Sequence, residues 1–336
     1  MLADRYYYNQ LSQEEKKAYS ALYKGIIALD KEITVSIKNA TAETVGTLFH
    51  AMSHDNPNIY YFNQTCLNYT LYRNEIRLMP QYFCKKEEIA TYNQRIQDCV
   101  NKIVSELGLQ QCTDLEKVKR VHDYLVKHVS YDEEALHTNK IPRLIAAHSI
   151  IGVFARQRAV CEGIAKATKI LLNTANVACI VVSGEASVNN PGRHSWNVVR
   201  IDGKPYHLDV TWDLNRSRNG FINYDYFNVP DCAISKDHFD YVAPRCTSWD
   251  ANYLHARGLV FSNTRQIKQY LSKEIDVGKN NFYYSMQGSA HNMAEVAELS
   301  KNLLIEELIG RNIQARITMV FNKEQETVQL SYQHVK

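Results

Sequence analysis

A histidine and an aspartate with catalytic potential lie in a single predicted β-hairpin. The segment RHSWNVVRIDGKPYHLDVTWD, residues 193–213, reads as two strands joined at Asp202-Gly203. A two-residue Asp-Gly loop is among the strongest short-range hairpin signals, and it fixes how the two strands pair. His194 and Asp209 occupy positions where a plain hairpin would carry apolar side chains. This departure indicates a chemical role for the hairpin.

The predicted register brings the polar side chains of this hairpin together. With Asp-Gly in the turn, Trp196 faces Asp209 and His194 faces Thr211. Because side chains alternate along a strand, four residues share one face: His194, Trp196, His207 and Asp209. His194 and Asp209 are then diagonal neighbours, with Cα atoms roughly 7–8 Å apart. A three-residue loop would turn Asp209 to the other face, so the observed register tests this prediction.

A cysteine at the start of a predicted helix completes a possible triad. Of the eight cysteines, Cys161 alone begins a helix, and apolar residues at helical spacing turn it inward. The helix dipole contributes about 0.3–1 kcal/mol, or up to about 2, whereas pairing with histidine stabilises a thiolate by about 6 kcal/mol. An adjacent imidazolium is therefore required. His194, oriented by Asp209, is the expected source.

Two other interpretations of these residues remain open at this stage. A histidine beside an aspartate is often a structural ion pair on a sheet face. Four residues also offer the ligand types of a zinc site: Cys161, His194, His207 and Asp209. Their spacing matches no zinc signature, so we predict no metal and no other cofactor.

Three short motifs resemble the transglutaminase-like superfamily, in the form found in bacterial proteins. They are AVCEGIAKA, HSWNVV and YHLDVTWD, in this order, and the resemblance extends over about residues 114–213. It implies a papain-like fold in which Cys161 is the nucleophile, His194 the general base and acid, and Asp209 the orienting carboxylate. Two positions depart from the family pattern, Ile164 where an aromatic residue is common and Pro205 where tryptophan is common. Neither belongs to the triad.

The resemblance also implies the type of reaction. Active members of the superfamily attack an amide carbonyl with the thiolate and form a thioester. We expect a protein or peptide substrate and favour hydrolysis, as in a peptidase, amidase or deamidase. The sequence contains no calcium loop of the EF-hand type. The alternatives are a transamidating, cross-linking transglutaminase and a non-catalytic interaction module with a vestigial triad.

The rest of the predicted cleft is less well defined by the sequence. Gln157 is the nearest upstream amide that could serve as a second oxyanion donor, although it is closer to the cysteine than the papain-type glutamine. Trp196 is expected either to line the cleft or to pack in the core. Asp213 is expected at the end of the second hairpin strand, where it affects packing more than chemistry.

Composition excludes some classes of function. The chain has 336 residues and a net charge of +3, with no run of basic residues that would indicate a nucleic-acid surface. No stretch approaches the roughly 20 apolar residues of a membrane span. The N-terminus has no signal-peptide pattern, and the cysteines form no CxxC pair. We expect mostly reduced thiols and a cytoplasmic protein, or a secreted or cell-surface one if a leader has been removed.

The expected architecture is an α+β fold in three regions. Residues 1–110 form an N-terminal α+β region, and the capping box of Ser12 and Glu15 begins its first long helix. Residues 111–250 form the papain-like transglutaminase core, a helix carrying the cysteine packed on an antiparallel sheet, and Thr113 and Glu116 form its first capping box. Residues 256–336 form a small C-terminal α/β domain without recognisable chemistry.

Overall fold

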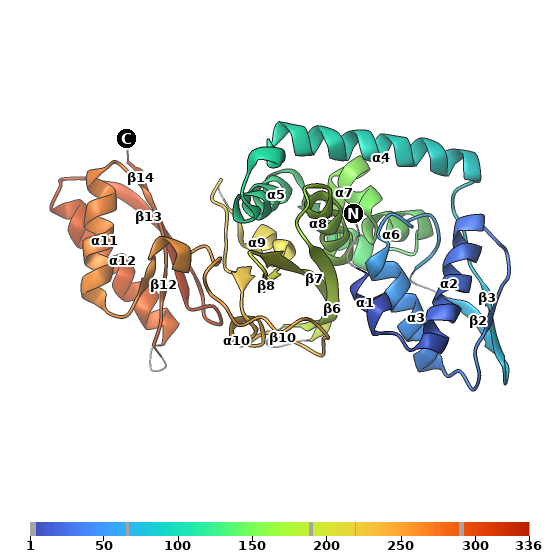
Figure 1. The fold of residues 1–336 in the computed structure, drawn as a ribbon. Helices are drawn as coiled ribbons and strands as arrows, with labels where there is room; N and C mark the ends of the chain where they lie inside the picture. The colour runs from blue at the N-terminus through green and yellow to red at the C-terminus, as the bar shows by residue number, and fades with distance from the viewer. Residues whose placement is uncertain (1–4, 65–66, 188–190, 219, 289–291, 336) are drawn as a thin grey trace. The chain divides into compact units, whose positions relative to one another are not determined.

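The computed structural model describes residues 5–64, 67–187, 191–218, 220–288 and 292–335 (Figure 1). The chain divides into two compact units. Unit 1 comprises Met1–Asn223 and His238–Cys246, and unit 2 comprises Tyr224–Asp237 and Thr247–Lys336. The division differs from the three predicted regions, because the N-terminal region and the core fall into one unit and the chain passes between the units three times.

The N-terminal part of unit 1 combines helices with a small antiparallel sheet. Its elements are α1 (Tyr6–Gln10), α2 (Gln13–Ala28), β1 (Ile33–Ser36), α3 (Ala42–Asp55), β2 (Asn68–Leu71) and β3 (Glu75–Met79), with sheet order β1-β3-β2. The predicted capping box at the start of α2 is confirmed, with both of its hydrogen bonds formed. The hydrophobic core of this part also contains Ile150 of the following helical part. Shared burial explains why the two predicted regions form one unit.

Helices dominate the middle of unit 1. The elements are α4 (Lys86–Glu106), η1 (Leu109–Gln111), α5 (Asp114–His128), β4 (Ser130–Tyr131), η2 (Glu133–His137), α6 (Ile141–Ala147), α7 (Ile150–Arg156), β5 (Arg158–Ala159) and α8 (Cys161–Thr174). The capping box of Thr113 and Glu116 begins α5 as predicted. In α8, a Cβ atom at Gly163 would stand 2.3 Å from the carbonyl oxygen of Ala147. Glycine therefore lets the helix that carries Cys161 approach the preceding backbone closely.

The sheet that contains the predicted hairpin lies in unit 1. Strands β6 (Cys179–Ala186), β7 (Gly192–Ile201), β8 (Lys204–Leu208) and β10 (His238–Phe239) lie in the order β10-β6-β7-β8. Asp202 and Gly203 form the turn with φ angles of 48° and 80°, as a two-residue hairpin loop requires. The ladder runs from Ile201↔Lys204 to Asn197↔Leu208, so the predicted register is confirmed over this length.

Beyond Leu208 the prediction of a continuing strand is wrong. Asp209 is the N-cap of α9 (Val210–Arg216), and its side chain accepts hydrogen bonds from the backbone N–H groups of Thr211 and Trp212. The predicted pairing of Thr211 with His194 is therefore not formed in the ladder, and Asp213 lies in a helix. The physical reason is that an aspartate side chain can satisfy the first N–H groups of a helix, which ends the strand at this point.

Unit 2 contains the predicted C-terminal α/β arrangement. Its elements are β9 (Phe227–Val229), α10 (Asp231–Ile234), η3 (His255–Arg257), β11 (Val260–Phe261), α11 (Thr264–Asp276), β12 (Asn281–Met286), α12 (Met293–Ile309), β13 (Ala315–Asn322) and β14 (Thr327–His334). Four strands form a sheet in the order β11-β12-β14-β13, in which β11 and β12 are parallel. Apolar residues of α11 and α12, coloured orange to red in Figure 1, form one core with the sheet.

Two general features concern the described residues only. None of the helices in the described ranges is both long and apolar enough to cross a membrane. The seven cysteines in these ranges form no disulfide with one another.

Candidate active site

The predicted histidine and aspartate meet at the end of the sheet that contains the hairpin. His194 Nε2 lies 2.6 Å from Asp209 Oδ2. Both side chains are buried, with 8% of His194 and none of Asp209 exposed. The contact uses Nε2, which leaves Nδ1 as the ring nitrogen that can exchange a proton with a reactant.

Cys161 is brought to the same place by a different element. It is the first residue of α8, after the N-cap Val160, and it is half-buried. His194 forms a side-chain hydrogen bond with Cys161 in addition to the one with Asp209. The three residues predicted to form a triad therefore adjoin one another in the order Cys161, His194, Asp209.

The electrostatics of the pair favour a charged histidine. Burial alone would lower the pKa of His194, but the negative charge of Asp209 and the hydrogen bonds to Asp209 and Cys161 outweigh it and raise the pKa to about 10. Burial would likewise raise the pKa of Asp209, but the charge of His194 outweighs that effect and keeps it well below its usual range. The site therefore stabilises the imidazolium form of His194.

Asp209 is held by more than His194. Its Oδ1 accepts from the backbone N–H groups of Thr211 at 2.9 Å and Trp212 at 3.1 Å. Its Oδ2 also lies 3.1 Å from Nε2 of His238, a fully buried residue of β10. No pattern in the sequence pointed to His238.

The geometry also bears on the zinc alternative. His207 belongs to the predicted zinc set, but it is not one of the side chains that the structure groups with His194 and Asp209, and its Nδ1 accepts a hydrogen bond from Trp196 Nε1 at 3.0 Å. The side chains of His194, Asp209 and His238 do offer ligand atoms within 4.8 Å of one another. However, zinc bond lengths of 2.0–2.2 Å place neighbouring ligands about 3.3 Å apart. The 2.6 Å contact between His194 and Asp209 fits a shared proton better.

Tyr131 is a second residue that the sequence analysis passed over. It ends β4, which pairs in parallel with β5, the strand that leads into Cys161. Its phenol hydrogen bonds with both the side chain and the backbone of Cys161. Burial, together with the nearby charges of Cys161 and Asp209, raises the pKa of Tyr131, so the hydroxyl keeps its proton at neutral pH. Tyr131 lies within residues 114–213, over which the resemblance extends, but in none of the three quoted motifs.

The remaining predicted residues lie around the triad rather than in it. Gln157 is exposed at the end of α7 with a φ of 52°, and its backbone carbonyl accepts from Ser130 N at 2.9 Å; its role as an oxyanion donor stays a prediction. Trp196 is 1% exposed and packs in the core, with its ring stacked at 5.9 Å from that of His194. Asp213 Oδ2 lies 3.0 Å from His122 Nε2.

An ion pair between a buried lysine and a partly buried glutamate lies in α8 close to Cys161. Lys166 is 1% exposed, and its Nζ lies 2.6 Å from Glu162 Oε1 and 2.6 Å from Gln64 Oε1. His148 Nδ1 lies 2.9 Å from the other oxygen of Glu162. Because Gln64 belongs to the N-terminal part, this part of unit 1 supports the helix that presents Cys161.

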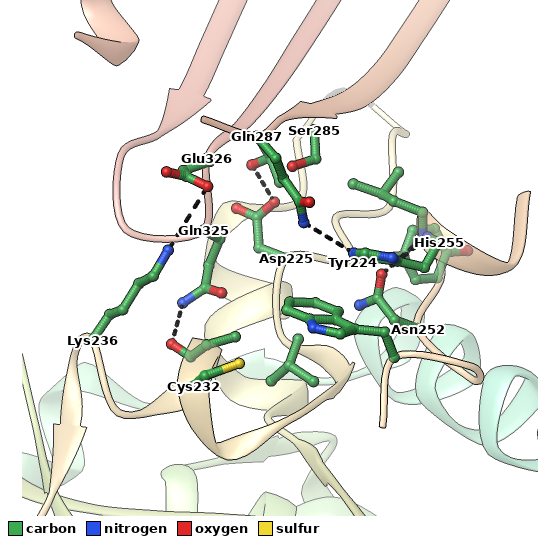
Figure 2. A pocket seen from close by; sticks show the side chains of 15 residues that line it. Tyr224, Asp225, Cys232, Lys236, Asn252, His255, Ser285, Gln287, Gln325 and Glu326 are labelled. Carbon is green, nitrogen blue, oxygen red and sulfur yellow. Dashed lines mark hydrogen bonds and ion pairs between the residues drawn. The ribbon is translucent and has the colours of Figure 1, made fainter. Parts of the chain in front are cut away.

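Unit 2 has a cavity of its own, which contains no residue of the triad. Its volume is about 130 Å³, and Figure 2 shows polar side chains around it. These side chains largely satisfy one another. Asp225 accepts from Tyr283 and Thr327 at 2.6 Å each, and Gln287 Nε2 lies 3.1 Å from His255 Nε2. This internal pairing favours a structural role for the polar lining.

One segment of the chain is similar to a known protein family. Residues 101–212, about a third of the chain, match the model of the transglutaminase-like superfamily, so this segment is similar to that superfamily.

Among individual proteins, the kyphoscoliosis peptidase of Mus musculus is 24% identical over 184 residues, which are 50% of this chain and 27% of that protein. The Homo sapiens kyphoscoliosis peptidase is 26% identical over 155 residues, 42% of this chain and 23% of that protein. The chain thus spans about a quarter of the length of these curated relatives. A crystal structure of a TGase is 17% identical with a TM-score of 0.31, and the match covers 54% of this chain and 50% of that one.

Proposed function

We propose that the protein is a cysteine-dependent acyl-transfer enzyme that acts on amide bonds of proteins or peptides, with Cys161, His194 and Asp209 as its triad. The observation that carries the proposal is the buried 2.6 Å contact between His194 and Asp209, with His194 also hydrogen bonded to a cysteine at a helix start. Such a chain of groups activates a nucleophile.

The acylation step uses His194 twice. His194 takes the thiol proton, and the Cys161 sulfur attacks the amide carbonyl carbon to give a tetrahedral oxyanion. Collapse of this intermediate breaks the C–N bond, and the imidazolium of His194 gives its proton to the departing amine or ammonia. The product is a thioester on Cys161. Asp209 stays ionised throughout and stabilises the charged His194.

Two donors can turn to the oxyanion once substrate displaces the contact between them. The backbone N–H of Cys161 stands at the beginning of α8, where helix N–H groups have no intrahelical partner. The phenol of Tyr131 adjoins both this N–H and the sulfur and carries a proton to donate. We assign Tyr131 as the second oxyanion donor, the part for which the sequence offered only Gln157.

Hydrolysis is the favoured fate of the thioester. Cys161 is half-buried rather than enclosed, so water can reach the acyl group. His194 would take a proton from that water as it attacks, which releases a carboxylic acid and restores the thiol. A transamidating enzyme must instead admit an amine and limit water.

The proposal is tested with wild-type protein and Cys161→Ala on casein and on glutamine-containing peptides. We expect peptide cleavage or ammonia release to exceed incorporation of a fluorescent primary amine, and all three to vanish in the variant. Dominant amine incorporation would identify a transamidase.

A second measurement separates an inactive triad from an unsuitable substrate. Iodoacetamide should alkylate Cys161 rapidly at about pH 6, where a free thiol is largely protonated, and His194→Ala should abolish this reactivity. A chain that shows neither turnover nor selective alkylation would be a non-catalytic interaction module.

A further inference from the structure

We propose that His238 is a positioning residue that holds the carboxylate of Asp209 in the orientation the triad needs. The inference rests on the proposed function, since it concerns how the triad is kept in register. It assigns a role to a residue outside the three matched motifs.

The first observation is that two imidazoles share one carboxylate oxygen. Oδ2 of Asp209 lies 2.6 Å from Nε2 of His194 and 3.1 Å from Nε2 of His238. A carboxylate oxygen only accepts, so each ring nitrogen must carry a proton. Neutral His194 is thereby fixed as the tautomer with its proton on Nε2 and a lone pair on Nδ1, the form that can take the thiol proton.

The second observation is that His238 is itself held firmly. It lies in β10, where it pairs with Ala186 of β6. Its ring centroid lies 4.5 Å from that of Trp212 and 4.9 Å from that of Trp196, and none of the residue is exposed. A side chain packed between two indoles and fixed by a strand can hold its partner in one place.

The third observation is that Asp209 needs such support. The β7–β8 ladder ends at Leu208, so Asp209 is not paired in the sheet. The N–H groups of α9 hold Oδ1, but a carboxylate held at one oxygen can still turn. His194 cannot serve as the fixed donor, because it must exchange its proton with Cys161 and a leaving group in every cycle. His238 takes no part in that exchange and remains available throughout.

The test compares leucine, glutamine and asparagine at position 238 in the full chain. Glutamine can place an N–H group where Nε2 stands in histidine, whereas asparagine is too short and leucine has no donor. We expect His238→Leu and His238→Asn to slow alkylation of Cys161 by iodoacetamide at about pH 6 by about 10- to 100-fold, as expected for a misplaced catalytic group. The pH at which the alkylation rate rises on the acid side should also move upward in these two variants. His238→Gln should restore both the rate at about pH 6 and the position of this rise.

His207→Leu is the matched control. It also removes a fully buried imidazole from the same sheet, but His207 contacts Trp196 rather than Asp209. We expect the alkylation rate of Cys161 in His207→Leu to depend on pH as it does in wild type. A wild-type profile for His238→Leu, or equal losses in His207→Leu, would overturn the proposal. If leucine prevents folding, identical profiles for the glutamine and asparagine variants would overturn it as well.

The reference variant Asp209→Asn separates this inference from the proposed function. If Asp209→Asn slows alkylation and His238→Leu does not, the triad stands and only the role of His238 fails. If Asp209→Asn itself reacts like wild type, the proposed triad fails.

Discussion

The most informative perturbation of the site is Asp209→Asn, because it changes charge while keeping shape. Asp209 has two structural duties, the cap of α9 through Oδ1 and the contact with His194 through Oδ2. An asparagine oxygen can keep the first, since asparagine and aspartate are comparable N-caps. Its amide nitrogen would then face His194 Nε2 as a donor, which forces the ring into the wrong tautomer. The fold should survive while the chemistry fails.

The size of the effect follows from the stabilisation of the imidazolium. The pKa of His194 rises from 6.5 to about 10, and at about 1.4 kcal/mol per pH unit this is about 5 kcal/mol in favour of the charged ring. Asp209 raises the pKa of His194 by enough to outweigh the lowering that burial causes. If the imidazolium of His194, which forms during the reaction, loses about 5 kcal/mol of stabilisation, turnover falls by about three to four powers of ten. The corresponding change in serine proteases costs about 10⁴-fold.

The assay measures amide hydrolysis and thermal unfolding on the same preparations of wild type and Asp209→Asn. We expect turnover to fall by this amount, with a midpoint of unfolding that changes little. A folded Asp209→Asn protein that keeps turnover within about tenfold of wild type would refute the assignment of Asp209.

Three further predictions use other residues of unit 1. Asp213→Asn should lower the midpoint of thermal unfolding with little loss of turnover, and His207→Gln should keep most of the activity. If both variants lost as much turnover as Asp209→Asn, the assignment of the triad would be contradicted. Tyr131→Phe should lower turnover by about 10²- to 10³-fold, as for other oxyanion donors, and a rate equal to wild type would leave Tyr131 without that role. The raised pKa of His194 adds stability that is fully present below about pH 6.5 and is lost as the pH rises through about 10, so the free energy of unfolding should decline over this range in wild type and stay flatter in His194→Ala.

The hairpin could be predicted because its register depends on local chemistry. Asp202 and Gly203 adopt positive φ angles, which a tight two-residue loop requires and which these residue types tolerate. Alternation along the strands then determines which side chains share a face. The thiol was equally accessible to prediction, because helix periodicity alone places Cys161 at the first turn of α8.

The end of the hairpin shows where local reasoning fails. The residues after Leu208 include β-branched and aromatic types that suit a strand, yet the side chain of Asp209 captures two backbone N–H groups and starts a helix. Strand propensity and capping compete here, and the tertiary contacts of Asp209 decide between them. His238 lies 29 positions from Asp209 in a two-residue strand, and no local pattern encodes such a contact. The interaction of Gln64 with Lys166, 102 positions apart, was hidden for the same reason.

Among the described residues of unit 1, a second aspartate, Asp213, also has a buried histidine beside it, and the comparison with His194 and Asp209 explains why such a pair is not in itself an active site. His122 and Asp213 are both fully buried and 3.0 Å apart. The second ring nitrogen of His122 lies 3.1 Å from Asp123 Oδ1, so carboxylates flank the ring on both sides. This raises the pKa of His122 despite its burial and engages both nitrogens in structural contacts. His194 has only one nitrogen committed to Asp209 and the other side of its ring next to Cys161, and that asymmetry lets it accept a proton from one partner while the other stabilises the resulting charge.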